Sequence, residues 1–182
     1  LKSELIKEGH KFTSQTDTEV IVHLIEKFYS NPMPLEEAVR KAIAKLEGSF
    51  AIAIVAKREP DKLVGARSGS PLVVGVGKKE NFLASDVPAL LNFAQNVIYL
   101  EDNELVTLTR DRVRITNASG EVIVRQPARI VWDITQAQKQ GWPHFMLKEI
   151  NEQPAILEGI LNRRIKKETS EIFFEELEIA PE

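Results

Sequence analysis

The sequence contains no cysteine among its 182 residues. This absence excludes disulfide bonds, thiolate metal sites and a cysteine nucleophile. Histidine is also scarce: His10, His23 and His144 are far apart and show no H-x-x-x-H spacing, which predicts no metal site and no cofactor. No hydrophobic run approaches the ~20 residues of a membrane helix, and no signal peptide is recognisable. These absences predict a cytoplasmic protein without a membrane partner.

An excess of basic residues is missing as well. Lys and Arg number 24 against 27 Asp and Glu, which gives a formal net charge of -3. Non-specific binding to nucleic acid needs a dense basic surface, so no nucleic-acid partner is predicted. What is present is ordinary for a folded protein, with 43% hydrophobic and 28% charged residues.

Helices are predicted near the start of the chain. Val20, Leu24 and Phe28 recur every four residues and predict an amphipathic helix. A second helix is predicted over residues 35–46, because its apolar residues share one face. An earlier short helix ends at Gly9, and no capping residue precedes it, so we expect the chain to be a piece of a longer protein.

Strands follow these helices. Residues 49–55 form a continuous apolar run, which predicts a strand buried on both faces. Residues 63–67 and 72–77 flank an SGSP turn and are predicted to pair as a hairpin. Further elements are predicted at residues 81–85, 97–100, 104–109, 112–116 and 121–125 as strands, and at 87–93 as a short helix capped by Asp86. This order indicates the α+β class, with helices stacked on a mostly antiparallel sheet.

The strand signal fades at about Gln126. The segment beyond it carries Trp132 and Trp142 and is predicted to be a linker that leads into a long helical pattern. Pro154 lies inside this pattern, so we expect one helix to end near Glu152 and another to begin near Pro154.

The stretch SQTDTEVIVHLIEKF, residues 14–28, admits two interpretations. In the first, Thr16 caps the helix, Glu19 completes a capping box, and Asp17 interacts favourably with the helix dipole. In the second, Asp17 faces a pocket and binds a cationic group of a small ligand, while Thr16 and Thr18 fix its rotamer by hydrogen bonds. The pattern alone does not separate the two.

The residues themselves predict no catalytic centre. GARSGSPL at 65–72 is typical of a turn, and GVGKK at 75–79 lacks the spacing of phosphate-binding loops. No Ser-His-Asp arrangement is indicated. A non-catalytic binding module is therefore one open interpretation.

The sequence resembles the glutamine–fructose-6-phosphate aminotransferase family (glucosamine-6-phosphate synthases) in GHKFTSQTDTEVIVHLIE, LEGSFAIAIV, ARSGSPLVVGVG with ENFLASDVPALL, and HFMLKEINEQPAIL. The similarity runs in order from Leu1 to about Leu161. It implies the N-terminal-nucleophile fold, an αββα sandwich of two antiparallel sheets between helical layers. It also implies that residues 1–126 are the C-terminal portion of a class II glutamine amidotransferase (glutaminase) domain. Residues 127–182 would be the interdomain linker and the start of the sugar-isomerase region.

Members of this family transfer the amide nitrogen of glutamine to fructose 6-phosphate, giving glucosamine 6-phosphate and glutamate, and are usually homodimers. The resemblance implies that Asp17 binds the α-ammonium group of glutamine, with Thr16 and Thr18 beside it. The family's nucleophilic Cys, its Arg-Trp-x-x-His segment and its oxyanion-hole Asn-Gly lie before the point that matches Leu1, and the sugar-phosphate site lies beyond Glu182. The resemblance therefore implies no catalytic residue in this chain and no glutaminase activity for it alone.

A half-domain of another class II amidotransferase is the competing prediction. Phosphoribosyl-pyrophosphate amidotransferase and asparagine synthetase are the two candidate types. MLKEINEQP, residues 146–154, resembles the junction between glutaminase and isomerase domains and argues against both.

Overall fold

The computed structural model describes residues 1–130, 141–165 and 172. The chain divides into two compact units, Leu1–Val131 and Trp132–Glu182. Strand pairing in the first unit continues past residue 126, because β9 (Ala128–Arg129) pairs with β5 (Asn96–Tyr99). The assignment of residues 1–126 and 127–182 to two domains stays a prediction. Within the described ranges, no helix is both long enough and apolar enough to cross a bilayer.

The first unit contains helices followed by strands, as the sequence pattern predicts. Besides β5 and β9, its elements are α1 (Lys2–Lys7), α2 (Thr18–Phe28), α3 (Leu35–Ile43), β1 (Phe50–Ala56), β2 (Glu59–Ser68), β3 (Val73–Val76), β4 (Asn81–Ala84), η1 (Val87–Ala89), β6 (Leu105–Leu108), β7 (Val113–Thr116) and β8 (Val122–Ile123).

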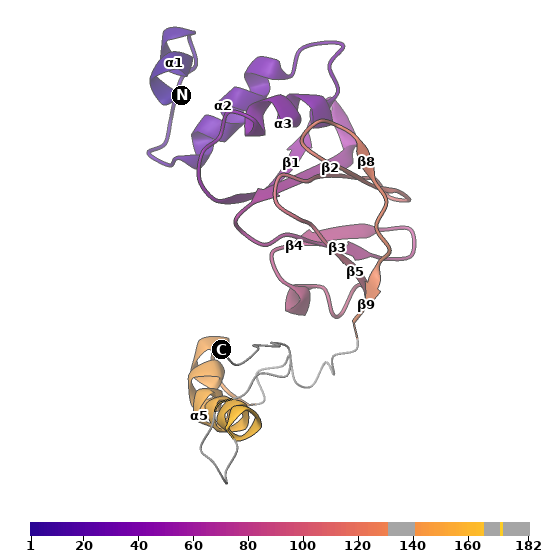
Figure 1. Ribbon diagram of the computed structural model, residues 1–182. Helices are drawn as coiled ribbons and strands as arrows, with labels where there is room; N and C mark the ends of the chain where they lie inside the picture. Colours follow the sequence, from indigo (N-terminus) through magenta and orange to yellow (C-terminus); the bar gives the residue numbers. More distant parts are fainter. Residues whose placement is uncertain (131–140, 166–171, 173–182) are drawn as a thin grey trace, which may run out of the picture. The chain divides into compact units, whose positions relative to one another are not determined.

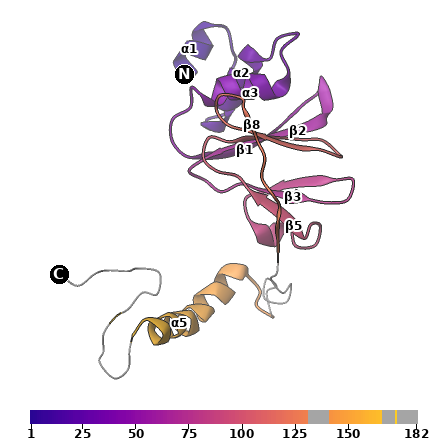
Figure 2. The ribbon, with the colours of Figure 1, turned by 45° about the vertical axis from the view of Figure 1, so that its right-hand side comes forward.

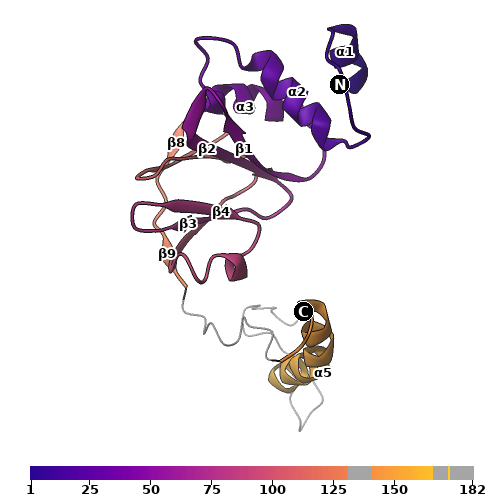
Figure 3. The same cartoon turned by 180° about the vertical axis from the view of Figure 1, so that it is seen from behind.

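Two antiparallel sheets form the centre of this unit. One has the strand order β1-β2-β6-β7-β8 and the other β4-β3-β5-β9. Figure 1 shows them as two stacked layers, with α2 and α3 covering the outer face of β1 and β2, and the views in Figures 2 and 3 agree. The α+β class is confirmed, and the helix–sheet–sheet order corresponds to three successive layers of the αββα sandwich.

The period-2 alternation of strands distributes apolar residues over three clusters. Leu105 packs under the helices, whereas its neighbour Val106 packs between the sheets. Likewise Val74 lies between the sheets and Val73 lies on the far side, with η1. Gly65 permits close approach of the layers, because a Cβ there would lie 2.6 Å from Leu83 Cδ2.

The N-terminus of α3 is capped by a strand residue. Its N-cap position is Pro34, which has no side-chain acceptor, and Glu59 Oε1 on β2 instead accepts hydrogen bonds from the Leu35 N–H and the Tyr29 hydroxyl, both at 2.8 Å. Lys62 pairs with Glu59 and lies 2.8 Å from Glu36 Oε2. Partial burial raises the pKa of Glu59, but these hydrogen bonds outweigh it and lower the pKa below 4.5.

The predicted hairpin of residues 63–67 and 72–77 is wrong. β2 belongs to the five-stranded sheet and β3 to the four-stranded sheet, so the SGSP segment carries the chain from one sheet to the other. Gly69 has a φ of 70°, and its N–H donates to Asp102 Oδ1 at 2.9 Å. Arg67 pairs with the same carboxylate oxygen at 2.5 Å, which fixes the crossing.

The prediction that residues 49–55 are buried on both faces is also wrong. Phe50, Ile52 and Ile54 pack partly against the helices, but Val55 on the other face is 72% exposed. The reason is that β1 is the edge strand of the five-stranded sheet. The facing sheet ends opposite β2, where β4 lies against Gly65.

The second unit contains one continuous helix, α5 (Phe145–Arg164), with Pro154 inside it. The predicted break near Pro154 is therefore wrong. A proline removes one backbone donor, and the remaining hydrogen bonds of this helix are enough to continue it. Trp132 lies outside the described residues.

The short helix predicted over residues 87–93 of the first unit is also a correction, because only the 3-10 turn η1 forms there. Asp86 accepts from the Val87 N–H, as predicted.

Candidate functional site

The loop before α2 ends at Asp17, which occupies the N-cap position of that helix. The predicted capping box is wrong, because Thr16 is not the cap and the Asp17 side chain makes no capping hydrogen bond among the described residues. The Thr18 hydroxyl donates to Asp17 Oδ1 at 3.4 Å, and Thr16 Oγ1 lies 2.8 Å from Ser14 Oγ. Asp17 is exposed. The helix start therefore presents a carboxylate whose oxygens are not used to hold the helix.

Glu19, two residues further on, is fully engaged. Its Oε1 accepts from the Thr13 N–H at 2.7 Å, and its Oε2 accepts from the Ser14 N–H at 2.7 Å and the Ser14 hydroxyl at 2.6 Å. The hydrogen bond from the Ser14 side chain, followed by that from the Thr13 backbone, lowers the pKa of Glu19 from 4.5 to about 2. This carboxylate closes the loop against α2 and holds Asp17 in place.

A pocket of about 740 Å³ adjoins Asp17. It is lined by α2, the loop after α3 and β1, through Leu1, Asp17, Thr18, Val20, Ile21, Lys45, Leu46, Glu47, Ser49, Phe50, Ala51, Ile52 and Ser70. Two of the three predicted site residues, Asp17 and Thr18, line it, and Thr16 does not. Acidic side chains outnumber Lys45 in this wall, and apolar residues form much of the rest. Such a pocket suits a small ligand with one cationic group.

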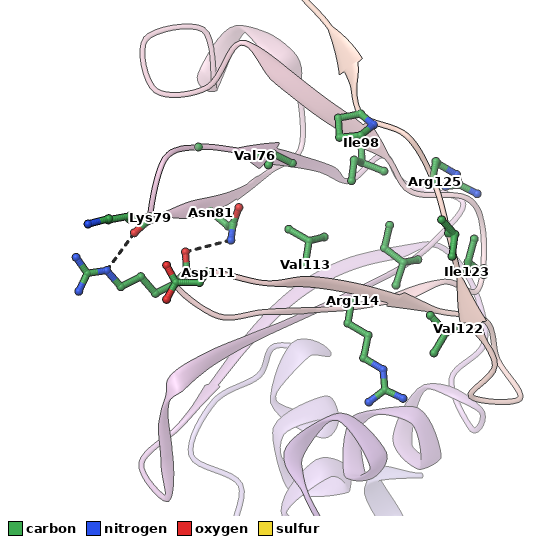
Figure 4. Close-up of a pocket in the computed structure, with 15 residues that line it drawn as sticks. Val76, Lys79, Asn81, Ile98, Asp111, Val113, Arg114, Val122, Ile123 and Arg125 are labelled. Carbon is green, nitrogen blue, oxygen red and sulfur yellow. Dashed lines mark hydrogen bonds between the residues drawn. The ribbon is translucent and has the colours of Figure 1, made fainter.

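A second pocket, of about 440 Å³, lies where β3–β5 face β7 and β8 (Figure 4). Its basic residues are largely engaged: Arg110 donates to the Lys79 carbonyl at 3.2 Å, and Arg125 donates to both oxygens of Glu104 at 2.8 Å. The hydrogen bonds to the buried Glu104 raise the pKa of Arg125. In Figure 4 Arg114 points toward the helices. Its lining has four basic residues against one acid, Asp111, so the pocket at Asp17 is the better candidate site for an ammonium group.

Histidines brought together by the fold form a third polar group, which sequence spacing did not indicate. His10, which follows α1, places Nδ1 3.2 Å from Nδ1 of His23 on α2. Glu26 Oε2 lies 3.5 Å from both nitrogens. The two histidines are 13 positions apart, and only the packing of the loop on α2 makes them neighbours.

Residues 1–92 match the protein family described as glutamine amidotransferase domain. The chain is 52% identical over 161 residues to glutamine–fructose-6-phosphate aminotransferase [isomerizing] of Methanothermobacter thermautotrophicus, covering 88% of this chain and 27% of that protein. The protein of the same name from Caldanaerobacter subterraneus subsp. tengcongensis is 41% identical over all 182 residues, which make up 29% of it. The chain thus spans a little more than a quarter of the length of these relatives.

A solved structure has a similar fold. Glutamine phosphoribosylpyrophosphate amidotransferase from B. subtilis matches with a TM-score of 0.53 and 23% identity, covering 66% of this chain and 26% of that one. At this identity the similarity concerns the fold alone.

Proposed function

Because this chain belongs to the glutamine amidotransferase domain family, we propose that it forms part of a glutamine site in which Asp17 binds the α-ammonium group of the substrate. The observation that carries this proposal is the position of the Asp17 carboxylate. It lines the 740 Å³ pocket at the start of α2, and the helix does not use it as a side-chain cap.

Elementary electrostatics supports this role. A carboxylate that accepts from an ammonium group makes a charge-assisted hydrogen bond, roughly twice as strong as a neutral one. Thr18 orients Asp17 through its hydroxyl, and Thr16 lies beside it, bonded to Ser14. The arrangement selects glutamine over amides that lack the α-amino group.

The longer polypeptide is proposed to be a glutamine–fructose-6-phosphate aminotransferase. It would release the amide nitrogen of glutamine and transfer it to fructose 6-phosphate, as a cytoplasmic homodimer. Identities of 41–52% to proteins of that name support this assignment. The identity to the phosphoribosylpyrophosphate amidotransferase of similar fold is lower, at 23%. A cysteine nucleophile for the amide would come from outside these 182 residues, since they contain none. The chain alone is therefore expected to release no glutamate from glutamine.

The test is Asp17→Asn in a polypeptide of the relatives' full length that carries this chain. Loss of one charged hydrogen bond costs about 1.5–3 kcal/mol, so the KM for glutamine should rise roughly 10- to 150-fold. Glutaramate, the analogue without the α-amino group, should be turned over by the variant as poorly as by the unsubstituted protein. Glutaminase kinetics with both substrates measure this discrimination.

The matched control is Asp111→Asn, the same substitution on the wall of the other pocket. It should leave the KM for glutamine within about twofold. An unchanged preference for glutamine over glutaramate in the Asp17→Asn variant would refute the proposed role.

A further inference from the structure

Three potential metal ligands converge on the outer side of α2. They are Nδ1 of His10, Nδ1 of His23 and a carboxylate oxygen of Glu26, and all lie within 4.8 Å of one another. The two nitrogens are 3.2 Å apart, and each lies 3.5 Å from Glu26 Oε2. The three atoms therefore form a nearly equilateral triangle.

We propose that this triangle is a binding site for a divalent transition-metal ion of the zinc type. A tetrahedral ion with ligand bonds of about 2.0–2.1 Å separates its ligand atoms by roughly 3.3 Å, which matches the observed separations. Two imidazoles and one carboxylate are a ligand set that Zn²⁺ takes, with the fourth position left to water. This site opposes the sequence-based prediction of no histidine metal site, which considered spacing along the chain only.

A simple hydrogen bond between the two imidazoles accounts for less of the geometry. It explains the 3.2 Å separation of the two nitrogens but not the carboxylate oxygen placed at 3.5 Å from both of them, beyond normal hydrogen-bond length. A common ligand point in front of all three atoms explains the three distances together.

The surroundings hold the ligand groups in orientation. The His23 ring lies against the ring of Phe12, with centroids 4.4 Å apart. Glu19 Oε1 lies 3.5 Å from Nε2 of His23, the ring nitrogen turned away from the proposed ion. Glu19 is itself held by hydrogen bonds from Thr13 and Ser14, so its negative charge stays close to this ring. The side chains of His10 and His23 are 17% and 16% exposed and that of Glu26 is 70% exposed, so an ion has access from solvent.

The experiment is a calorimetric titration of the metal-free 182-residue chain with ZnCl₂, with CoCl₂ as a spectroscopic probe. We expect one zinc ion per chain, and intense visible absorption from a tetrahedral cobalt complex. His10→Ala and Glu26→Gln should each weaken zinc binding by roughly 10- to 100-fold or more. Glu26 is largely exposed, so its variant keeps the fold and the result does not depend on the stability of the His10 variant.

The matched control is His144→Ala, which removes the chain's remaining histidine in the second unit. It should leave the affinity within about twofold. Failure of the unsubstituted chain to bind one equivalent, or an equal loss in the His144 and Glu26 variants, would overturn the proposal. Because the measurement is metal binding, it is independent of the outcome for Asp17 and glutamine.

Discussion

The N-termini of α2 and α3 lie in the same helical layer, and each has a carboxylate at its first turn, but the two carboxylates are used differently. At α3, Glu59 reaches from β2 and accepts from the Leu35 N–H, the Tyr29 hydroxyl and Lys62. At α2, the Asp17 side chain caps nothing among the described residues and lines a pocket. The first carboxylate contributes to stability, and the second makes no hydrogen bond that caps its helix.

The difference separates a carboxylate that holds a helix start from one that its helix does not use. Glu19 holds the loop before α2, because its carboxylate accepts hydrogen bonds from the Thr13 and Ser14 N–H groups. Asp17 itself is then not needed to hold the loop. The substitutions below test whether Glu59 and Glu19 stabilise the fold while Asp17 does not.

The largest effect on stability is expected for Glu59→Ala. This substitution leaves the Leu35 N–H, the Tyr29 hydroxyl and Lys62 without their shared acceptor, which should lower the free energy of unfolding by about 1–3 kcal/mol. Urea unfolding measures the change. Asp61→Ala, an exposed acid two positions along β2, is the control and should stay within about 0.5 kcal/mol. Equal losses in the two variants would contradict the anchoring role of Glu59.

A smaller effect is expected from protonation of Glu19. Its pKa is about 2 in the folded chain and ordinarily 4.5, so the carboxylate stabilises the fold above pH 4.5, and this contribution is lost as the pH falls toward 2. The unfolding free energy of the Glu19→Gln variant should therefore fall less steeply over this interval than that of the unsubstituted chain. Urea unfolding at several pH values measures both slopes, and parallel curves would show that Glu19 is not an anchor.

The smallest effect is expected for Asp17→Asn. Its carboxylate contributes no cap, so the unfolding free energy should change by no more than about 0.5 kcal/mol. Urea unfolding of this variant beside Glu59→Ala gives the comparison directly. A loss as large as that of Glu59→Ala would show that Asp17 holds the helix, and the two helix starts would then be alike.

The sequence predicted the positions of most helices and strands because these follow from apolar periodicity. It did not predict how the strands combine: an apolar run on each side of SGSP suits a hairpin and a crossing between sheets equally well. Likewise, the apolar run of residues 49–55 does not reveal that β1 lies at a sheet edge. Both errors concern the partners of a strand, which depend on distant parts of the chain.

For the candidate site too, the sequence predicted the local features but not the partners that lie far apart along the chain. Asp17 and Thr18 were named from a local motif and its resemblance to a family, and the structure adds the pocket that they line. The capping box failed because Glu19 bonds Thr13 and Ser14, which the four-residue motif does not include. Glu59 caps a helix that begins 24 positions earlier, and no local pattern indicates such a partner.

The crossing at Gly69 also limits how the sheets can move apart. Only residues 69–72 separate β2 from β3, a tether whose ends reach roughly 17 Å when fully extended, against a normal sheet separation of about 10 Å. At this point the end of β2 and the start of β3 can therefore move apart by no more than roughly 7 Å beyond the normal spacing. Any opening between the two sheets has to hinge about this crossing and is widest at the ends of the strands far from it.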